Sequence, residues 1–369
     1  MKILHVVHSL EPGGMENGLV NMARALTPRG FEFHVACLEQ RGAFAERLPL
    51  PESTFVLGKK SGFSAGAAWN LGRAISKLRP DIVHSHNLGP LIYSGLATLG
   101  GLRIPLIQGE HSQFTREELS PRRLRQRRGL YRACRAIHTV SEGTRAELLS
   151  LGFPAQKITT ITNGVDTTHF APSEREPART ALGLSPDAQC FGIVGRFGPY
   201  KQHLQLIEAF ETMAAQFPRA HLLVAGGGGC EEVVVKDRAR ASSVRERIHL
   251  LGFQADPRLC YHALDLLVIP STNEGLSNAA LEAMACGVPA LVRTGCGHEQ
   301  IITPELDGWI SDLHSAENLA EELARILSSP SRLVDFGTNA RKKVVEQFSL
   351  HSMTDAYEHL YRACARLQL

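Results

Sequence analysis

Two glutamates, Glu274 and Glu282, stand eight positions apart in the segment STNEGLSNAALEAMACG. Gly275 permits a tight turn, and the apolar residues beyond Asn278 have helical spacing, so Glu282 is expected two turns into a helix. Backbone N–H groups at the start of that helix suit a bound phosphate. The pattern predicts an anion site flanked by two carboxylates, formed by Glu274, Gly275, Leu276, Ser277, Asn278 and Glu282. The alternative is a capping Glu274 and a solvated Glu282.

Two cations, Arg196 and Lys201, stand five positions apart in the segment GIVGRFGPYK. The segment follows an apolar run of strand length, and Lys201 is expected to open a helix. A guanidinium and an ammonium at this spacing can hold a diphosphate from one side. They can also stabilise the charge that develops when the diphosphate leaves, a task that a metal ion performs in other enzymes. The alternative is a pair of surface cations.

Glycine-rich turns and a histidine follow other apolar runs. Gly13 and Gly14 let the backbone approach a ligand and begin a helix whose N-terminus favours an anion. Gly226 begins a run of four glycines, but no acid follows at the distance that an NAD ribose requires. His111 comes directly after a strand-like run, where it can hydrogen-bond a bound sugar. The turn at residues 294–299, which ends on Glu299, is equally compatible with a simple loop.

These residues need a scaffold that gathers the ends of several strands. Strand-length apolar runs alternate with amphipathic segments of helix length, which indicates parallel sheets covered on both faces. Strands are predicted at residues 3–7, 31–38, 81–85, 104–108, 136–140 and 158–161, and again at 191–195, 221–225, 248–252, 266–270 and 288–292. Helices are predicted at residues 14–28, 64–78, 121–134, 201–217, 316–327, 332–347 and 350–367.

The repeated pattern predicts an α/β protein with two doubly wound, Rossmann-like domains. A Pro- and Ser-rich stretch at residues 168–186 is interpreted as a linker. The first domain is expected at residues 1–167, with a final helix at about 350–369 packing back on it, and the second at 168–349. Ligands of open parallel sheets bind beyond the carboxyl ends of the strands, where all the motifs fall. His84 and His86 end another strand and are expected to shape the floor of the site without chemistry of their own.

Composition excludes several classes of protein. The 369 residues carry a net charge of only +3, which gives no whole-chain footprint for nucleic acid. The first apolar run is too short for a signal peptide, and residues 87–102 are too short and too rich in glycine for a membrane span. The eight cysteines are scattered and are interpreted as buried thiols of a cytoplasmic protein.

The segment from Glu274 to Glu282 resembles the E-x7-E signature of glycosyltransferase family 4, and the segment from Arg196 to Lys201 resembles its G-R-x4-K pattern. The resemblance extends over the whole chain. It implies the GT-B fold, in which two Rossmann-like domains face each other across a cleft, and a retaining transferase that needs no cofactor and no metal. It also implies that Glu274 contacts the donor sugar, that Glu282 contacts the ribose, and that His111 lines the cleft beside the sugar.

By the same resemblance, Arg196 and Lys201 bind the donor phosphates, and Gly13, Gly14 and Gly226 lie close to the nucleotide. The expected catalytic residues are therefore His111, Arg196, Lys201 and Glu274. The expected partners are a UDP- or GDP-sugar that donates a hexose or N-acetylhexosamine, and a saccharide or lipid-linked acceptor. The expected context is the synthesis of a polysaccharide or glycoconjugate.

An arginine-rich segment at residues 116–135 adds a second hypothesis. Its arginines cover most faces of the predicted helix, so a solvated helix and contact with an anionic membrane or a lipid-diphosphate acceptor both stay open. Contact through Arg122 to Arg135 would make the protein peripheral at the inner face of the membrane.

Three other functions share parts of the pattern. The glycine run at Gly226 suggests a nicotinamide-dependent oxidoreductase, which the missing ribose acid disfavours. A non-catalytic binding protein of the same fold is disfavoured by the intact Glu274, Glu282, Arg196 and Lys201. A nucleotide-sugar epimerase can share the fold, but the two glutamates favour transfer.

Overall fold

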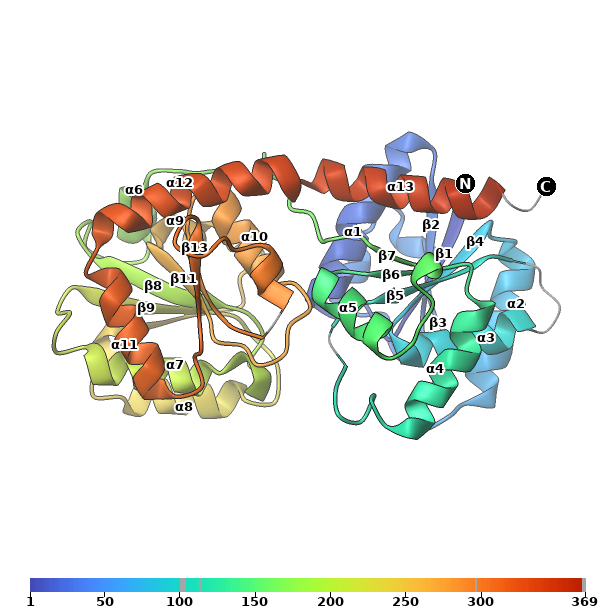
Figure 1. Ribbon diagram of the computed structural model, residues 1–369, viewed down its shortest axis with the longest axis horizontal. Helices are drawn as coiled ribbons and strands as arrows, with labels where there is room; N and C mark the ends of the chain where they lie inside the picture. Colours follow the sequence, from blue (N-terminus) through green and yellow to red (C-terminus); the bar gives the residue numbers. More distant parts are fainter. Residues whose placement is uncertain (100–103, 113, 296, 367–369) are drawn as a thin grey trace. The chain divides into compact units, whose positions relative to one another are not determined.

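The computed structural model describes residues 1–99, 104–112, 114–295 and 297–366. The chain forms two compact units, Met1–Gly164 with Leu350–Leu369, and Val165–Ser349. Each is an open sheet of parallel strands with helices on both faces, as Figure 1 shows for each unit. No helix in the described part of the chain is both long and apolar enough to span a bilayer.

The sheet of the first unit has seven parallel strands in the order β3-β2-β1-β4-β5-β6-β7. They are β1 (Lys2–Val7), β2 (Glu32–Cys37), β3 (Thr54–Val56), β4 (Ile82–His86), β5 (Leu106–Glu110), β6 (Ala136–Thr139) and β7 (Ile158–Thr160). The chain moves from β1 to β2 and β3 on one side and then crosses to β4 on the other. The strand order therefore reverses between β1 and β4. Doubly wound sheets bind ligands at this switch point.

Helices cover both faces of this sheet. They are α1 (Gly14–Leu26), α2 (Ala65–Leu78), α3 (Leu88–Leu99), α4 (Pro121–Ala133), α5 (Glu142–Ser150) and α13 (Leu350–Arg366), with short 3-10 turns η1 (Thr27–Arg29), η2 (Ala43–Arg47), η3 (Pro51–Ser53) and η4 (Ala155–Lys157). Because strand side chains alternate between faces, Ile3 and Val7 pack with α1 and α13, whereas Leu4 and Val6 pack with α2 to α5. The C-terminal helix α13 thus completes the core of the first unit and lies beside α1 (Figure 1).

The second unit has six parallel strands in the order β10-β9-β8-β11-β12-β13. They are β8 (Gln189–Val194), β9 (Ala220–Ala225), β10 (Ile248–Gly252), β11 (Leu266–Ile269), β12 (Ala290–Arg293) and β13 (Gly308–Ser311). Its helices are α6 (Arg175–Ala181), α7 (His203–Met213), α8 (Glu232–Ala241), α9 (Arg258–Ala263), α10 (Asn278–Ala285), α11 (Ala316–Leu327) and α12 (Pro330–Gln347), with η5 (Pro199–Lys201), η6 (Arg245–Arg247) and η7 (Gly297–Gln300). The strand order of this sheet reverses between β8 and β11.

The structure corrects some boundaries. The stretch interpreted as a linker contains α6, in which Ala178 and Arg179 are buried and Arg179 bonds Asp265 at 2.7 Å, so it packs as part of the second unit and is not a bare connection. Lys201 ends the turn η5 and does not open a helix, because Gln202 adopts a left-handed conformation before α7 begins. The cysteines of the described residues are free thiols and are buried except for the exposed Cys230. Cys296 lies outside the described residues.

Candidate active site

The two charged motifs meet at the carboxyl edge of the second sheet. Strands β8 and β11 are direct neighbours, although they lie far apart in the sequence. The loop after β8 carries Arg196 and Lys201, and the loop after β11 carries Glu274. A backbone hydrogen bond from Thr272 N–H to the Tyr200 carbonyl, at 2.8 Å, ties the two loops together. The topology therefore puts both motifs at the switch point, where the strand order of the sheet reverses.

Lys201 and Glu274 form an ion pair. Only 15% of the lysine side chain and 14% of the glutamate side chain are exposed. The lysine stem passes over Gly195, where an added Cβ would lie 3.5 Å from Cε. A partly buried charge pair of this kind needs both partners, because removal of one leaves the other poorly solvated. The pair joins the residue predicted to bind phosphate and the residue predicted to bind sugar.

Glycines allow the loops around this pair to pack backbone against backbone. A Cβ on Gly226 would lie 1.9 Å from the Gly195 carbonyl oxygen, and a Cβ on Gly297 would lie 1.5 Å from that of Gly275. Gly229 has a φ of +97°, and a Cβ there would lie 2.0 Å from the Phe197 carbonyl oxygen. The run at residues 226–229 therefore serves close packing of the β8 and β9 loops. This is a structural reason for glycine that the sequence alone did not show.

Helix α10 begins where the sequence predicts. The Ser277 hydroxyl caps it by accepting from the Ala280 N–H at 3.4 Å, and Leu276 and Ser277 are buried. Glu282 is half-buried and accepts a hydrogen bond from the hydroxyl of Tyr261 on α9, at 2.8 Å. Burial, and then the nearby Glu282 carboxylate, raise the pKa of Tyr261, which keeps the hydroxyl protonated as a donor. Glu282 is thus held by a second residue and is not merely a solvated helix side chain.

Tyr261 is the site residue that sequence reasoning missed. It lies in a short helix between two predicted strands, and no motif marks it. Its ring is fully buried, so only its hydroxyl can act, and that hydroxyl contacts Glu282. Only the three-dimensional pairing of α9 with α10 reveals this role. The side chains of His298 and Glu299 lie outside the described part of the chain.

The remaining candidates belong to the first unit, at the carboxyl edge of its sheet. Gly13 is the cap of α1 and Gly14 its first residue, so the backbone N–H groups of this helix end face the loop after β1. His111 follows β5 directly, and its backbone N–H donates to the Asn87 side chain at 3.3 Å. These positions agree with the predicted turns. The structure does not place them relative to the second unit.

His111 ends a layer of five histidines. Burial lowers the pKa of His5 to about 3 and that of His111 to about 4. Burial, with added repulsion from the other imidazoles, holds the pKa values of His84, His86 and His138 well below their ordinary value. All five rings are therefore neutral at physiological pH, and His111 is unsuited to a role as a cation.

The arginine-rich segment is only partly available to a partner. Arg127 is fully buried and pairs with Glu110 and Glu118, with Oε1 of Glu118 2.9 Å from Nη2. It also lies over the Phe114 ring, with Cζ 4.0 Å from the centroid. The prediction that Arg127 belongs to a membrane-facing cluster is therefore wrong, because its charge serves the core of the unit.

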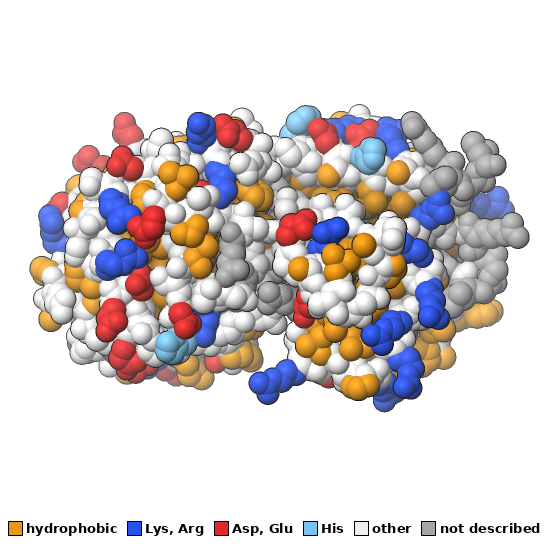
Figure 2. All heavy atoms as spheres, viewed as in Figure 1, with side chains coloured by type: hydrophobic (Ala, Val, Ile, Leu, Met, Phe, Trp, Pro, Cys, Tyr) orange, Lys and Arg blue, Asp and Glu red, His pale blue; other side chains and the backbone are white. Residues whose placement is uncertain are grey.

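The exposed arginines of α4 lie on the opposite side. At about 100° per residue, Arg122, Arg125, Arg128 and Arg132 fall within an arc of about 120°, away from Arg127. Figure 2 shows basic side chains at the surface of the first unit in the region where Figure 1 draws α4. These four exposed arginines thus form one stripe on the side of the helix away from Arg127.

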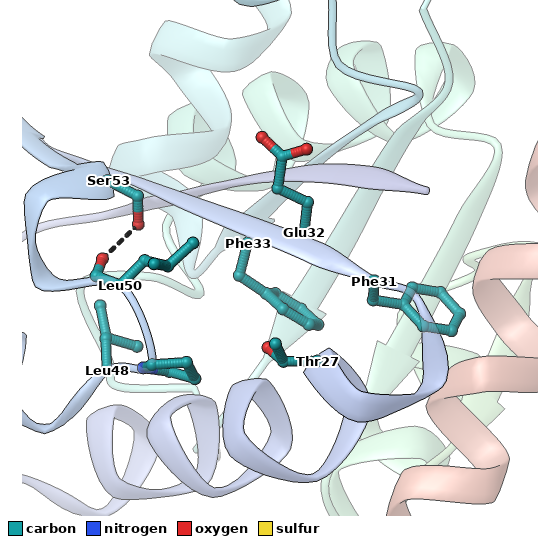
Figure 3. Close-up of a pocket in the computed structure, with 8 residues that line it drawn as sticks. Thr27, Phe31, Glu32, Phe33, Leu48, Leu50 and Ser53 are labelled. Atoms are coloured by element: carbon teal, nitrogen blue, oxygen red, sulfur yellow. Dashed lines mark hydrogen bonds between the residues drawn. The ribbon is translucent and has the colours of Figure 1, made fainter.

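A small apolar hollow of about 170 Å³ lies away from these loops. Phe31, Phe33 and Leu48 line it, and the Ser53 hydroxyl at its rim donates to the Leu50 carbonyl at 2.6 Å (Figure 3). It lies near the amino end of β2, whereas the candidate residues follow the carboxyl ends of strands. Its lining offers little polar chemistry, so it is not a candidate active site.

Comparison with known proteins agrees with this geometry. The sequence matches the family described as Glycosyltransferase Family 4 over residues 12–169 and that described as Glycosyl transferases group 1 over residues 174–343. D-inositol 3-phosphate glycosyltransferase 2 of Catenulispora acidiphila is 27% identical over 91% of this chain and 87% of that protein. A D-inositol 3-phosphate glycosyltransferase of Gordonia bronchialis is 32% identical, but the match spans 58% of this chain and about half (49%) of that protein.

Solved structures share the fold. Anabaena Alr3699/HepE, in complex with UDP-glucose, superposes with a TM-score of 0.86 at 21% identity, over 98% of this chain and 100% of that chain. The lipopolysaccharide outer core galactosyltransferase WaaB superposes with a TM-score of 0.73 at 17% identity, over all of both chains. At these identities the structural similarity shows the fold alone. Membership of the family rests on the two family matches, which together span most of the sequence. The chain therefore belongs to the group 1 glycosyltransferases of GT-B fold, with a family 4 first domain, and it is a glycosyltransferase.

Proposed function

We propose that the protein is a retaining glycosyltransferase that moves a hexose or N-acetylhexosamine from a UDP- or GDP-sugar to a saccharide or lipid-linked acceptor. The observation that carries the proposal is the Lys201–Glu274 ion pair at the switch point, where the strand order of the second sheet reverses. A nucleotide-sugar needs a cation for its diphosphate and an acceptor for its sugar hydroxyls, and this pair supplies both. The UDP-glucose in the Anabaena HepE structure supports this class of donor.

The proposed roles follow from the site. The second unit binds the donor: Lys201 and Arg196 hold the diphosphate and stabilise the charge of the leaving group. Glu274 accepts from sugar hydroxyls, and Glu282, held by Tyr261, accepts from the ribose. The first unit contributes the N-terminus of α1 at Gly13 and Gly14, the neutral His111 beside the sugar, and the surface that receives the acceptor.

Transfer is expected to need no divalent metal, because the cations Arg196 and Lys201 neutralise the diphosphate. The measurement is transfer from a UDP- or GDP-sugar in excess EDTA, with the anomeric configuration of the product read by NMR. Undiminished turnover with retained configuration supports the proposal. Turnover that EDTA abolishes and Mg²⁺ or Mn²⁺ restores would show that a metal is required, and inverted configuration would contradict the retaining mechanism.

Replacing Glu282 by alanine is expected to weaken binding of UDP or GDP by about 1–3 kcal/mol, because hydrogen bonds to a charged acceptor are lost. Isothermal titration calorimetry with the free nucleoside diphosphate measures this. The loss should be specific to the ribose. Wild type should therefore bind the nucleotide more tightly than its deoxyribose analogue, whereas Glu282→Ala should bind the two with equal affinity.

Tyr261→Phe provides a graded comparison for the same site. It removes the hydroxyl that holds Glu282 and keeps the buried ring. It should therefore reduce nucleotide affinity less than Glu282→Ala does, and it should reduce the difference in affinity between the ribose and the deoxyribose nucleotide. Glu322→Ala, which changes a half-buried glutamate of α11 that pairs with Arg325, is the control and should bind normally. Unchanged affinity in Glu282→Ala would reject the ribose assignment.

A second candidate acceptor comes from the relatives. The relatives from Catenulispora acidiphila and Gordonia bronchialis are both named as D-inositol 3-phosphate glycosyltransferases, and the first of them matches 91% of this chain. We therefore include a phosphorylated inositol among the candidate acceptors. An assay with inositol 3-phosphate, free inositol and a lipid-linked saccharide, each with the same donor, separates the candidates by which one yields a glycosylated product.

The exposed arginine stripe is expected to bind anionic vesicles. Each basic residue near an anionic surface contributes about 1 kcal/mol to the free energy of membrane binding, and the attraction fades within a Debye length. Vesicles rich in phosphatidylglycerol should therefore retain the protein at low salt and release it at high salt in a flotation assay. Replacing Arg122, Arg125 and Arg132 by serine should abolish retention, whereas Arg240→Ser on α8 should not. Equal recovery of wild type and the triple variant would favour the solvated helix.

A further inference from the structure

Five histidines from four strands of the first unit lie on one face of its sheet. They are His5 on β1, His84 and His86 on β4, His111 directly after β5 and His138 on β6. His5 pairs in register with His84, and Gly109 pairs with both His86 and His138. Because side chains alternate along a strand, these positions all point to the face that α1 and α13 cover. Each ring except that of His111 is buried.

The rings contact one another through their nitrogens. Nδ1 of His86 lies 2.8 Å from Nε2 of His111, and Nε2 of His86 lies 2.9 Å from Nδ1 of His5. Nε2 of His138 lies 2.9 Å from Nε2 of His84. Candidate ligand atoms of His86, His111 and His138 all lie within 4.8 Å of one another. The proposed function uses His111 alone and leaves the other rings without a role.

The absence of a side chain at Gly109 lets two of these nitrogens approach its backbone. A Cβ on this residue would lie 2.5 Å from Nε2 of His138 and 2.9 Å from Nε2 of His111. Both nitrogens therefore face the position that a side chain would fill. Imidazole binds metals at about 2.0–2.1 Å, so three nitrogens around one tetrahedral ion are about 3.3 Å apart. The nitrogens of His86 and His111, which are 2.8 Å apart, would move slightly apart to reach that spacing, and the nitrogen of His138, which lies within 4.8 Å of both, would adjust to it.

The chemistry of the three residues fits one class of ion. Neutral imidazoles favour Zn²⁺, Ni²⁺, Cu²⁺ and Co²⁺ over the oxygen-seeking Mg²⁺ and Ca²⁺. When Nδ1 of His86 is a ligand, its Nε2–H can donate to His5, as the outer ring atoms of metal-bound histidines usually do. When Nε2 of His138 is a ligand, the proton lies on Nδ1, a buried atom without a partner in the described structure.

We propose that His86, His111 and His138 form a binding site for a divalent transition-metal ion of the zinc type. Three ligands leave a fourth position open, and His111 is the one ligand of the three that is not fully buried. Occupancy holds the His111 ring through Nε2. Where His111 also contacts the donor sugar, a point that rests on the proposed function, the ion inhibits transfer.

The test is a Co²⁺ titration of the full-length protein after chelator treatment and dialysis, followed by visible absorption and by displacement with Zn²⁺. Wild type should bind one equivalent and show the intense visible bands of tetrahedral cobalt. His111→Asn and Gly109→Ala should weaken binding more than the roughly 10–100-fold that loss of a supporting residue costs. His111→Asn removes a ligand at a partly exposed position, whereas Gly109→Ala keeps every ligand and fills the space.

His221→Asn is the control. It breaks a second histidine pair, His221 with His249, in which Nδ1 and Nε2 are 3.0 Å apart in the second unit. This variant should bind Co²⁺ like wild type. Absence of binding by wild type overturns the proposal, as does binding that His221→Asn abolishes or that a folded His111→Asn retains. Circular dichroism confirms folding of each variant. A protein that binds the ion but transfers no sugar in its ion-free form would contradict the proposed function and leave the metal site intact.

Discussion

Replacing Lys201 by methionine is expected to lower kcat for sugar transfer by about 10²–10³-fold, the usual cost of one group that stabilises developing charge. Methionine keeps most of the side-chain length and removes the ammonium that pairs with Glu274. The loss should appear in kcat more than in KM, because the charge on the diphosphate grows as the glycosidic bond breaks. Steady-state kinetics with a saturating acceptor measure it.

Lys343 offers a control with matched burial. Its side chain is 15% exposed, as is that of Lys201, and it pairs with the 2% exposed Asp307 in the same unit. Lys343→Met should cost at least as much stability, since Asp307 is left without its cation, and should leave kcat near wild type. Equal kcat in Lys201→Met and Lys343→Met would mean that Lys201 is only a structural cation.

Replacing Arg127 by methionine is expected to destabilise the first unit by about 3–5 kcal/mol, because the Glu110 carboxylate is left buried without a cation. The variant also loses the bond to Glu118 and the contact with the Phe114 ring. Chemical denaturation monitored by circular dichroism measures the change, and the transition of the first unit should move while that of the second unit stays.

Arg125 lies on the same helix and is exposed. Arg125→Met should change stability by no more than about 0.5 kcal/mol, as surface substitutions usually do. A similar loss in both variants would mean that the helix depends on its total charge and not on the buried ion pair. Vesicle binding should respond in the opposite way, with Arg125 contributing and Arg127 not.

Sequence reasoning predicts the scaffold well because buried parallel strands carry a strong apolar signal. Strands such as β1 and β10 fall where their apolar runs predict, and the two doubly wound sheets follow from their order. Short elements with mixed composition escape it. The strand β3 (Thr54–Val56) has three residues, and α6 lies in a stretch whose prolines and serines suggested a linker.

The charged motifs were predictable because parallel topology gathers the ends of strands. Lys201 and Glu274 each follow a strand, and the strand order then makes them neighbours. Contacts between side chains on different helices carry no such signal, so the support of Glu282 by Tyr261 was missed. Arg127 was misjudged because charge pattern alone does not show which face of a helix packs inward. The histidine layer was missed for a related reason, since its members are spread over four strands.

The most direct measurement of the central claim is saturation-transfer NMR of the full-length protein with a panel of UDP-, GDP- and ADP-sugars. We predict saturation of the ribose and hexose protons for a UDP- or GDP-sugar, and its loss in the double variant Glu274→Gln, Glu282→Gln. Glutamine keeps the shape of both side chains, so the loss would report on the carboxylates themselves. Absence of saturation for every nucleotide-sugar, or undiminished saturation in the double variant, would contradict the proposed donor site.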